Sequence, residues 1–410
     1  MNIRQIRKIL KDTDFIHTSG TPQERQVAEY LAERCRALGV EARLEAFPVE
    51  MAEVHTSKLL ADGKEIPCRG HRCCGSGTVE AELCYLPNTD PASLAAVRGK
   101  IALLDTGVGY FLYQDLLANG AVGFLTYDGN VHYRDRDVAE KELRSYVAQG
   151  RKILCANINA KDAFRLVRDG VKRVSLTVGQ REYDGQSHNV IAEIPGRTDE
   201  WIVLTAHYDT TSLSRGSYDN MSGCIGLLHV MEKLLPTAPH RYGLRFIFCG
   251  SEERGLLGSK AYVRDHEAEL GKIALDVNLD MIGTYMGKFI ARCSAEEGLV
   301  TYLRYFAGER GWGMEARQGV YASDSTPFAD KGVPALSFAR IAPPSQATIH
   351  NRYDTAAVLS PDQLRRDGDF VADFTAHMAD AALCPVKREI PEKVRTELDE
   401  YMGRKRKEQY

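Results

Sequence analysis

The sequence predicts an α/β protein whose mostly parallel central sheet is flanked by helices. Four runs in its C-terminal half are apolar and rich in β-branched or aromatic residues, as strands of a buried parallel sheet are: WIVLTA, LRFIFC, IALDVNL and VPALSF. Between the first two runs lies a helical segment whose apolar face carries Ile225, Leu228, Met231 and Leu235. Strands that alternate with helices are typical of an open α/β sheet.

The first 47 residues predict two helices followed by an edge-type strand. Thr21 and Pro22, with Glu24 three residues after the threonine, form a signature of a helix N-terminus. The segment EARLEAFPV then alternates between apolar and polar residues, as a strand with one buried face does. We therefore expect these elements to pack on the same sheet as the four buried strands.

Residues 56–180 differ in texture from the segments on either side. They contain short strands such as GKIALLDTG, glycine-rich turns and small helices. We expect a discontinuous main domain over 1–55 and 181–385, interrupted by a small β-rich α/β domain over 56–180. Residues 386–410 form a charged tail, which we expect to be a solvated helix with a frayed basic end.

Composition and charge argue against nucleic acid and membranes as partners. The chain has 410 residues, of which 44% are hydrophobic and 27% charged, and its net charge is only −3. Its first residues, MNIRQIRKILKDTDF, lack the apolar run of a signal peptide, and no later run is long enough to span a membrane. Several of the ten cysteines, such as Cys224 and Cys249, lie in apolar runs. We therefore expect a reduced, cytoplasmic protein.

One cysteine cluster, CRGHRCC at 68–74, is a candidate for a soft metal site. Zinc modules usually combine two separated pairs of Cys or His ligands, and no second pair follows this cluster. We therefore expect no metal there.

Chemically active side chains gather where the predicted strands end. The strand ends and adjoining loops carry two imidazoles and five carboxylates: His207, Asp209, Asp219, Glu252, Glu253, Asp280 and His350. Taken singly, each has a structural explanation, such as a helix cap for Asp219. Ligands of an open α/β sheet bind outside the carboxyl ends of its strands, so these side chains should meet at one edge. So many carboxylates in one place need a countercharge, which points to bound cations.

The donor set predicts two divalent metal ions. Carboxylate oxygens with two imidazoles and no thiolate suit Zn²⁺, or Mn²⁺ or Co²⁺ in its place. Two metals about 3.5–4 Å apart polarise a carbonyl and activate a water molecule. One carboxylate must then bridge the metals, and another must stay off them as the general base. Glu252 and Glu253 leave the strand in different directions, so one can bind metal while the other faces the water, and their spacing alone leaves open which does which.

The motifs resemble those of the M28 family of dizinc peptidases, most of which are aminopeptidases. The matching segments, across about 186–360, are AHYDT, GSYDNMSG, FIFCGSEERGLLGSKAY, NLDMIG, SDSTPFADKGVP and IHNRYDT. The inserted segment, with GKIALLDTG and ANGAVGFLTYDG, resembles the protease-associated domain of many members. The N-terminal helices and strand are also similar to the opening of the family's catalytic domain. The main domain is then a metallopeptidase domain.

The resemblance implies a role for each site residue. His207 and Asp280 would bind one metal, Glu253 and His350 the other, and Asp219 would bridge them. Glu252 would be the general base and later the proton donor to the leaving amine. Asp209 would fix the orientation and tautomer of His207.

Two positions depart from the family pattern. Many members have a tyrosine, which acts as an oxyanion donor, where this chain has Ile349; Tyr353 or Arg340 could replace it. Members often read Ser-Asp-His where this chain reads Ser323-Asp324-Ser325. Neither change removes a metal ligand, and both bear on specificity and rate.

The leading prediction is an exopeptidase that removes N-terminal residues from peptides, with Glu252 as general base. A carboxypeptidase or dipeptidase on the same scaffold would need an arginine that reads a carboxylate, and Arg340 or Arg352 could serve. Glutaminyl cyclisation at a single zinc fits less well, because YDNMSG and both histidines suit two metals. A non-catalytic, receptor-like member would be marked by lost ligands, and none is lost. The expected partner is a peptide substrate, and a homo-oligomer is also compatible with the sequence.

Overall fold

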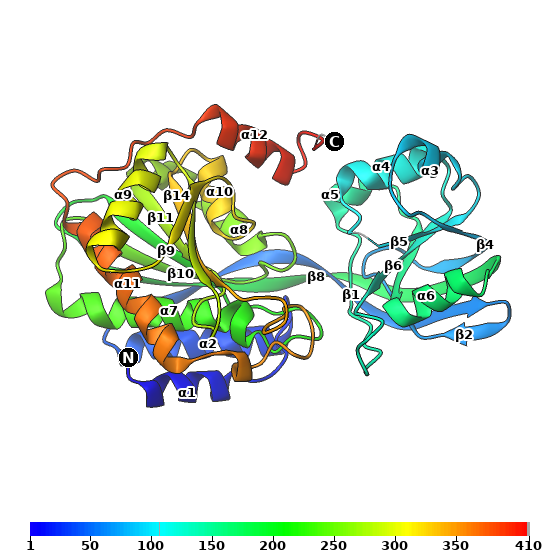
Figure 1. Ribbon diagram of the computed structural model, residues 1–410, viewed down its shortest axis with the longest axis horizontal. Helices are drawn as coiled ribbons and strands as arrows, with labels where there is room; N and C mark the ends of the chain where they lie inside the picture. Colours follow the sequence, from blue (N-terminus) through cyan, green and yellow to red (C-terminus); the bar gives the residue numbers. More distant parts are fainter. Residues whose placement is uncertain (106, 408–410) are drawn as a thin grey trace. The chain divides into compact units, whose positions relative to one another are not determined.

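A computed structural model of the chain describes residues 1–105 and 107–407 and divides them into two compact units (Figure 1). Unit 1 comprises Met1–Val49 and Gln186–Lys407, and unit 2 comprises Glu50–Gly185. Two long strands, β1 (Ala42–Ala61) and β8 (Arg173–Ile194), contribute residues to both units. Among the described residues, no helix has the length and apolar character needed to cross a membrane.

Unit 1 is built on a mostly parallel sheet with the order β13-β12-β14-β11-β9-β10-β8. Its four central strands are mutually parallel, whereas β8 runs antiparallel to β10, and β12 antiparallel to β14. The strands are β9 (Trp201–His207), β10 (Gly243–Cys249), β11 (Ile273–Leu279), β12 (Lys288–Ser294), β13 (Glu315–Gln318) and β14 (Ala335–Ile341). The four apolar runs in the sequence are these central strands, so the predicted fold class is confirmed.

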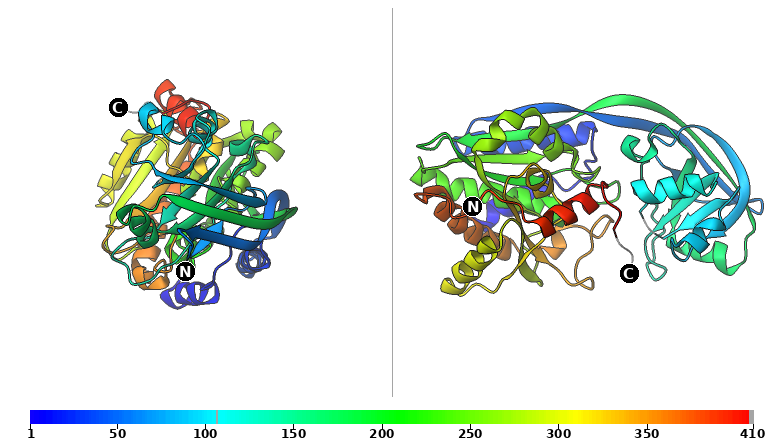
Figure 2. Two further views of the ribbon diagram at one scale, coloured as in Figure 1. Left: turned by 90° about the vertical axis from the view of Figure 1, so that its right-hand side faces the viewer. Right: turned by 90° about the horizontal axis from the view of Figure 1, so that it is seen from above.

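Helices cover both faces of this sheet (Figure 2). Residues of β9 alternate between two cores, because Ile202 and Leu204 join one apolar cluster and Val203 joins another. The first cluster includes residues of α1 (Ile3–Asp12), α2 (Pro22–Ala37), α7 (Ser222–Leu234), α9 (Glu297–Glu309) and α11 (Pro361–Asp380). The second cluster includes residues of α8 (Leu257–Asp265), α10 (Ser325–Asp330) and α12 (Glu392–Tyr401).

The last helix, α12, differs from the solvated tail that we expected. Val394 and Leu398 are 0% and 2% exposed, and they pack in the same cluster as Phe328 of α10. Both side chains lie on one face of the helix, four residues apart. Lys393 and Arg395 are exposed, whereas Glu397 accepts a hydrogen bond from N–H of Val320 at 3.0 Å. Because most residues of this segment are charged, the sequence did not predict its small apolar face, which packs against the rest of unit 1.

Unit 2 has a smaller parallel sheet and its own core. Strands β4, β5, β6 and β7 are parallel neighbours in that order, and β3 pairs antiparallel with β7. The short β2 (Lys64–Ile66) pairs with β1. The other elements are β3 (Cys68–Gly70), β4 (Gly77–Tyr85), α3 (Pro91–Ala95), β5 (Ile101–Leu104), α4 (Tyr110–Ala118), β6 (Gly123–Asp128), α5 (Ser145–Ala148), β7 (Leu154–Asn159) and α6 (Ala160–Arg168).

The CRGHRCC cluster is part of the packing of unit 2. His71 is 4% exposed, and its Nε2 lies 3.1 Å from Oγ1 of Thr126. Burial, assisted by the charge of Lys141, lowers the pKa of His71 to about 3. Neither of the two groups of potential metal ligands among the described residues includes this cluster.

Candidate metal centre

The site forms where three parallel strands of unit 1 end together. His207 is the last residue of β9 and lies in register with Cys249, the last residue of β10. Glu252 and Glu253 follow β10 after a short turn, and Asp280 follows β11 directly. The common edge predicted from the sequence therefore exists, and it carries the predicted side chains.

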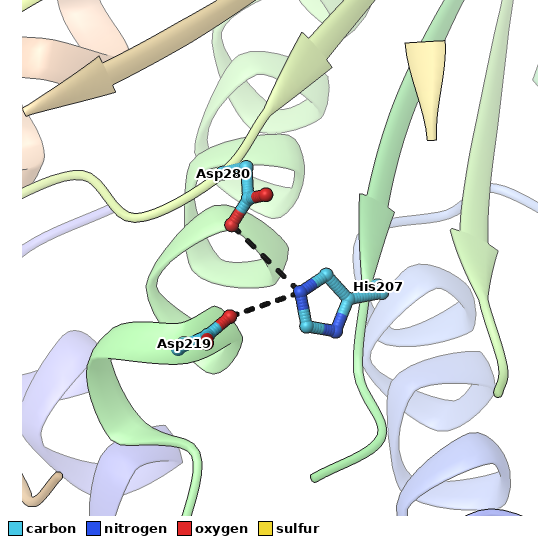
Figure 3. A group of neighbouring side chains, drawn as sticks. All are labelled: His207, Asp219 and Asp280. Carbon is cyan, nitrogen blue, oxygen red and sulfur yellow. Dashed lines mark hydrogen bonds and ion pairs between the residues drawn. The ribbon is translucent and has the colours of Figure 1, made fainter. Parts of the chain in front are cut away.

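His207, Asp219 and Asp280 form a first group of potential metal ligands (Figure 3). Nε2 of His207 lies 3.1 Å from Oδ1 of Asp219 and 3.7 Å from Oδ1 of Asp280. All three residues are buried, and one potential ligand atom from each lies within 4.8 Å of the others. These contacts bring the ends of β9 and β11 together with the turn Ser217–Met221, in which Asp219 and Asn220 have non-helical backbone angles.

Asp219 also belongs to a second group, with Glu253 and His350. Nε2 of His350 lies 3.1 Å from Oδ2 of Asp219 and 3.1 Å from Oε2 of Glu253. Asp219 therefore turns one carboxylate oxygen toward His207 and the other toward His350. This shared carboxylate joins two sets of ligands, each with one imidazole and one further carboxylate.

The structure separates the two adjacent glutamates, which the sequence alone could not do. Glu253 is a member of the second ligand group, whereas Glu252 belongs to neither group among the described residues. Oε2 of Glu252 lies 4.0 Å from Nε2 of His207, and its side chain is 11% exposed. Glu252 thus borders the ligand groups without being part of them.

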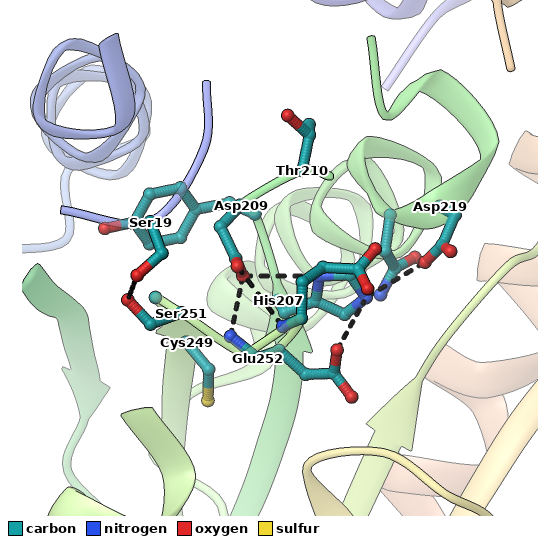
Figure 4. A network of polar contacts seen from close by, with 12 residues as sticks. Ser19, His207, Asp209, Thr210, Asp219, Cys249, Ser251 and Glu252 are labelled. Carbon is teal, nitrogen blue, oxygen red and sulfur yellow. Dashed lines mark hydrogen bonds and ion pairs between the residues drawn. The ribbon is translucent and has the colours of Figure 1, made fainter. Parts of the chain in front are cut away.

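Asp209 fixes the backbone of both glutamates (Figure 4). The backbone N–H of Glu252 donates to Oδ1 of Asp209 at 2.8 Å, and that of Glu253 donates to Oδ2 at 3.2 Å. Oδ1 of Asp209 also lies 3.6 Å from Nδ1 of His207, beyond hydrogen-bond distance. The sequence predicts that Asp209 orients His207. The fully buried carboxylate of Asp209 also holds the backbone N–H groups of the two glutamates, a role that the sequence did not reveal.

Glu24 is a second buried carboxylate that supports the same turn. Its Oε1 accepts hydrogen bonds from N–H of Ser251 at 3.0 Å, from Oγ of Ser251 at 3.1 Å and from Oγ of Ser187 at 2.7 Å. Its Oε2 accepts from N–H of Gly20 at 2.7 Å. Ser251 has a φ of +56°, which is unfavourable for a residue with a side chain, so this turn needs external support. Figure 4 shows the neighbouring contact between Ser19 and Ser251.

The sequence pattern pointed only to the role of Glu24 in starting a helix. Glu24 does lie in the first turn of α2, and its backbone N–H donates to Oγ1 of Thr21 at 3.2 Å, as the pattern predicts. Its contact with Ser251 spans 227 residues of the chain, and no local pattern encodes it. Burial, assisted by the negative charge of Asp209, raises the pKa of Glu24 to about 8.

We expect Glu24→Gln to change how stability depends on pH. A carboxyl group whose folded pKa of about 8 exceeds its ordinary 4.5 stabilises the fold below pH 4.5 and loses that contribution as pH rises through 8. The free energy of unfolding of the wild type should therefore fall relative to the variant between about pH 4.5 and 8, by at most about 1.4 kcal/mol per pH unit. Urea unfolding across this range measures the difference. Glu29→Gln, at an exposed position of the same helix, is the control, and parallel pH profiles for Glu24→Gln and wild type would contradict the prediction.

Asp354 holds the turn that carries Asp219. It accepts hydrogen bonds from the backbone N–H of Tyr218 at 2.8 Å, from that of Asp219 at 3.3 Å and from Oγ of Ser214 at 2.9 Å. Burial and the nearby charge of Asp219 raise the pKa of Asp354 to about 6. Asp354 is part of the IHNRYDT motif. The motif therefore contains this residue, but the sequence alone did not predict that it holds the turn of Asp219.

The two departures from the family pattern have different structural settings. Ile349 is partly buried against the core of unit 1. Ser325 is 2% exposed, and its Oγ lies 2.8 Å from Oγ of Ser337. Ser325 is therefore buried and paired with another hydroxyl in this chain.

Arg340 is engaged in structural contacts. Its Nε and Nη2 donate to the two oxygens of the buried Asp367 at 2.8 and 2.6 Å, and its Nη1 donates to the carbonyl of Gly287 at 3.1 Å. All three guanidinium nitrogens have partners, so Arg340 is unsuited to bind an oxyanion or a substrate carboxylate. Tyr353, the other proposed substitute for the missing tyrosine, is 41% exposed.

The crowded carboxylates of the site, and one buried carboxylate oxygen without a hydrogen-bond partner, are suited to binding cations. Burial and nearby carboxylates raise the pKa of Glu252 well above its ordinary value and that of Glu253 to about 7. Burial lowers the pKa of His207, but the surrounding carboxylates, Glu252 foremost, outweigh it and raise that pKa well above the ordinary value. Oδ1 of Asp280 is buried and makes no hydrogen bond within the described chain. Imidazole nitrogens and carboxylate oxygens together are a donor set that suits zinc.

Comparison with known proteins finds a family match over much of unit 1. Residues 189–375 match Peptidase family M28. The chain is 32% identical over 180 residues to aminopeptidase YwaD of Bacillus subtilis (strain 168), covering 42% of this chain and 39% of that protein. It is 31% identical over 194 residues to leucine aminopeptidase 2 of Trichophyton rubrum, covering 46% and 38%. The matched segments thus span about two fifths of the length of these curated relatives.

Solved structures match the fold over nearly the whole chain. A zinc aminopeptidase from Bacillus subtilis, BSAP, has a TM-score of 0.76 at 24% identity, covering 95% of this chain and 98% of that one. An aminopeptidase from Aneurinibacillus sp. strain AM-1 has a TM-score of 0.74 at 23% identity, covering 94% and 96%. At these identities the likeness concerns the fold.

Proposed function

We propose that the chain is a member of peptidase family M28, whose model matches residues 189–375, and that it is a metal-dependent aminopeptidase that removes N-terminal residues from peptides. The observation that carries this proposal is the position of Asp219. Its two carboxylate oxygens face two imidazoles, each of which has a further carboxylate beside it. A shared carboxylate between two such sets is the arrangement that a dinuclear site requires.

Each side chain then has a defined role. His207 and Asp280 would hold one metal ion, Glu253 and His350 the other, and Asp219 would bridge them, with Zn²⁺ the best match and Mn²⁺ or Co²⁺ as alternatives. Two such ions would supply Lewis-acid polarisation of the peptide carbonyl and activation of a water molecule. Asp209 positions the backbone of both glutamates and lies beside His207, which fixes the geometry of the set.

Glu252 is the general base in this proposal. It lies 4.0 Å from His207 of the first ligand group and belongs to neither group, so its carboxylate can accept the proton that the attacking water releases. The water oxygen bonds to the carbonyl carbon, and the π electrons of the C=O bond move onto its oxygen. The C–N bond then breaks as the C=O bond re-forms, and Glu252 passes the proton to the leaving amine. Burial, which raises the pKa of Glu252, makes this carboxylate a stronger base than one in water.

An N-terminal specificity is favoured over a C-terminal one. A carboxypeptidase needs a cationic side chain for the substrate carboxylate. Of the two candidates, the guanidinium of Arg340 is fully engaged by Asp367 and Gly287, which leaves only the exposed Arg352. The site instead presents carboxylates, which attract an N-terminal ammonium group. The complete ligand set also argues against a non-catalytic binding protein.

We further propose that unit 2 is a protease-associated domain and that the protein works in the cytoplasm. The first proposal rests on the insertion of a self-contained α/β unit between the two segments of unit 1. The second rests on buried thiols such as Cys35, Cys224 and Cys249, which form no disulfide.

A peptide assay tests the proposed activity. Zinc-reconstituted protein is incubated with one pentapeptide, either free or N-acetylated, and the products are followed by mass spectrometry. We expect stepwise loss of N-terminal residues from the free peptide and no cleavage of the acetylated one. Trimming from the C-terminus that ignores acetylation would overturn the proposal in favour of a carboxypeptidase.

A further inference from the structure

Tyr321 has a buried hydroxyl group without a hydrogen-bond partner among the described residues. Its backbone is held firmly, because its carbonyl accepts from N–H of Ser323 and from Oγ1 of Thr326, each at 2.8 Å. Oγ of Ser323 in turn accepts from Nδ2 of Asn278 at 3.0 Å. Asn278 lies in β11, two residues before Asp280, so this loop runs beside the strand end that carries a ligand of the site.

Tyr321 lies within electrostatic range of the carboxylates of the site. Burial raises the pKa of Tyr321 well above its ordinary value, and the negative charges of Asp280, Asp219 and Glu252 raise it further. The hydroxyl therefore stays protonated at neutral pH and remains a hydrogen-bond donor. The charges of these three carboxylates thus influence the hydroxyl, but it makes no hydrogen bond to any of the three residues.

Other buried tyrosines of unit 1 are satisfied. Tyr208 donates to the carbonyl of His188 at 2.7 Å, Tyr218 donates to the carbonyl of Arg340 at 2.7 Å, and Tyr262 accepts from Nη1 of Arg245 at 2.6 Å. An unpaired buried hydroxyl lowers stability, because it has lost water and gained no partner. The hydroxyl of Tyr321 therefore does not stabilise the fold. A role at the neighbouring metal centre would explain why this position has a tyrosine.

We propose that Tyr321 donates a hydrogen bond to the carbonyl oxygen of the scissile bond as that oxygen becomes negatively charged. The inference rests on the proposed function and adds a catalytic residue to it. It accounts for Ile349, at the position where many family members have a tyrosine, and for Arg340, which is engaged elsewhere. The donor comes here from the loop before α10, on the side of β11.

Tyr321→Phe tests the proposal, because it removes the hydroxyl and keeps the ring. We expect kcat for the free pentapeptide to fall about 10²-fold, as for the loss of one oxyanion donor, with KM little changed. The Tm of the variant should stay the same or rise, since no hydrogen bond is lost. Tyr262→Phe, which removes a satisfied hydroxyl, is the matched control and should lower the Tm with little change in kcat.

Inhibitor binding provides a readout besides turnover. The probes are an aminophosphonate analogue of leucine, which carries tetrahedral oxyanions, and leucine itself, both measured by calorimetry. Tyr321→Phe should weaken the phosphonate about 10²-fold and leucine by less than threefold. Equal effects on both probes, unchanged kcat, or a fall in Tm like that of Tyr262→Phe would overturn the inference. Failure of the wild type to cleave the free pentapeptide would instead overturn the proposed function, and the two failures are therefore distinguishable.

Discussion

Glu252→Gln is expected to lower kcat about 10³-fold while the protein still binds two zinc ions per chain. General-base catalysis contributes about 10²–10⁴-fold, and the amide that replaces the carboxylate cannot accept a proton. Because Glu252 is a member of neither ligand group, its replacement should leave the metal content unchanged. Steady-state kinetics and elemental analysis of the same sample measure both quantities.

The neighbouring glutamate is the matched control. Glu253→Gln makes the same chemical change one residue away, at a side chain 3.1 Å from Nε2 of His350. It should reduce the zinc content and lose activity for that reason, with partial recovery at high zinc concentration. If Glu252→Gln lost zinc and Glu253→Gln kept it, the roles of the two glutamates would be reversed.

Asp219→Asn is expected to remove both metal ions together. The side-chain amide of asparagine has one oxygen ligand where the aspartate has two, so it cannot bridge the two ligand groups that Asp219 joins. Loss of the metals removes several kcal/mol of transition-state stabilisation, so kcat/KM should fall about 10³-fold or more. Zinc stoichiometry should fall from two per chain to well below one.

Thermal stability gives an independent reading of the same change. A ligand that binds only the folded state at 1,000 times its Kd adds about 4.1 kcal/mol to stability, so zinc should raise the Tm of the wild type by several degrees. Asp219→Asn should abolish most of that increase. Asp265→Asn, at an exposed carboxylate paired with Arg264, should retain it. A zinc-dependent rise in Tm that survives Asp219→Asn would contradict the bridging role.

Much of the fold and of the site could be predicted because the relevant signals are local. The parallel strands of unit 1 are continuous apolar runs, and such runs specify burial on both faces. Once the strands are parallel, the residues that follow them must share one edge, which brings His207, Glu253 and Asp280 together. The proposed pairing of ligands is what the resemblance to the family motifs implies.

The remaining site features depend on contacts between distant segments. Glu24 reaches Ser251 across 227 residues, and the sequence shows only the helix start that Glu24 also provides. Glu253 belongs to a ligand group and Glu252 does not, and this difference depends on the turn that Asp209 holds. The buried hydroxyl of Tyr321 has no hydrogen-bond partner among the described residues, and a sequence pattern cannot predict that a partner is missing. The apolar face of α12 was hidden because only Val394 and Leu398, together with the preceding Ile390, are buried there.

Anomalous X-ray diffraction at the zinc edge, on crystals of the zinc-loaded protein, tests the dinuclear centre itself. We expect two peaks about 3.5–4 Å apart. One peak should lie against His207 and Asp280, the other against Glu253 and His350, with Asp219 between them. A single peak, or peaks beside the cysteine cluster at 68–74, would contradict the dinuclear centre on which the proposed aminopeptidase depends.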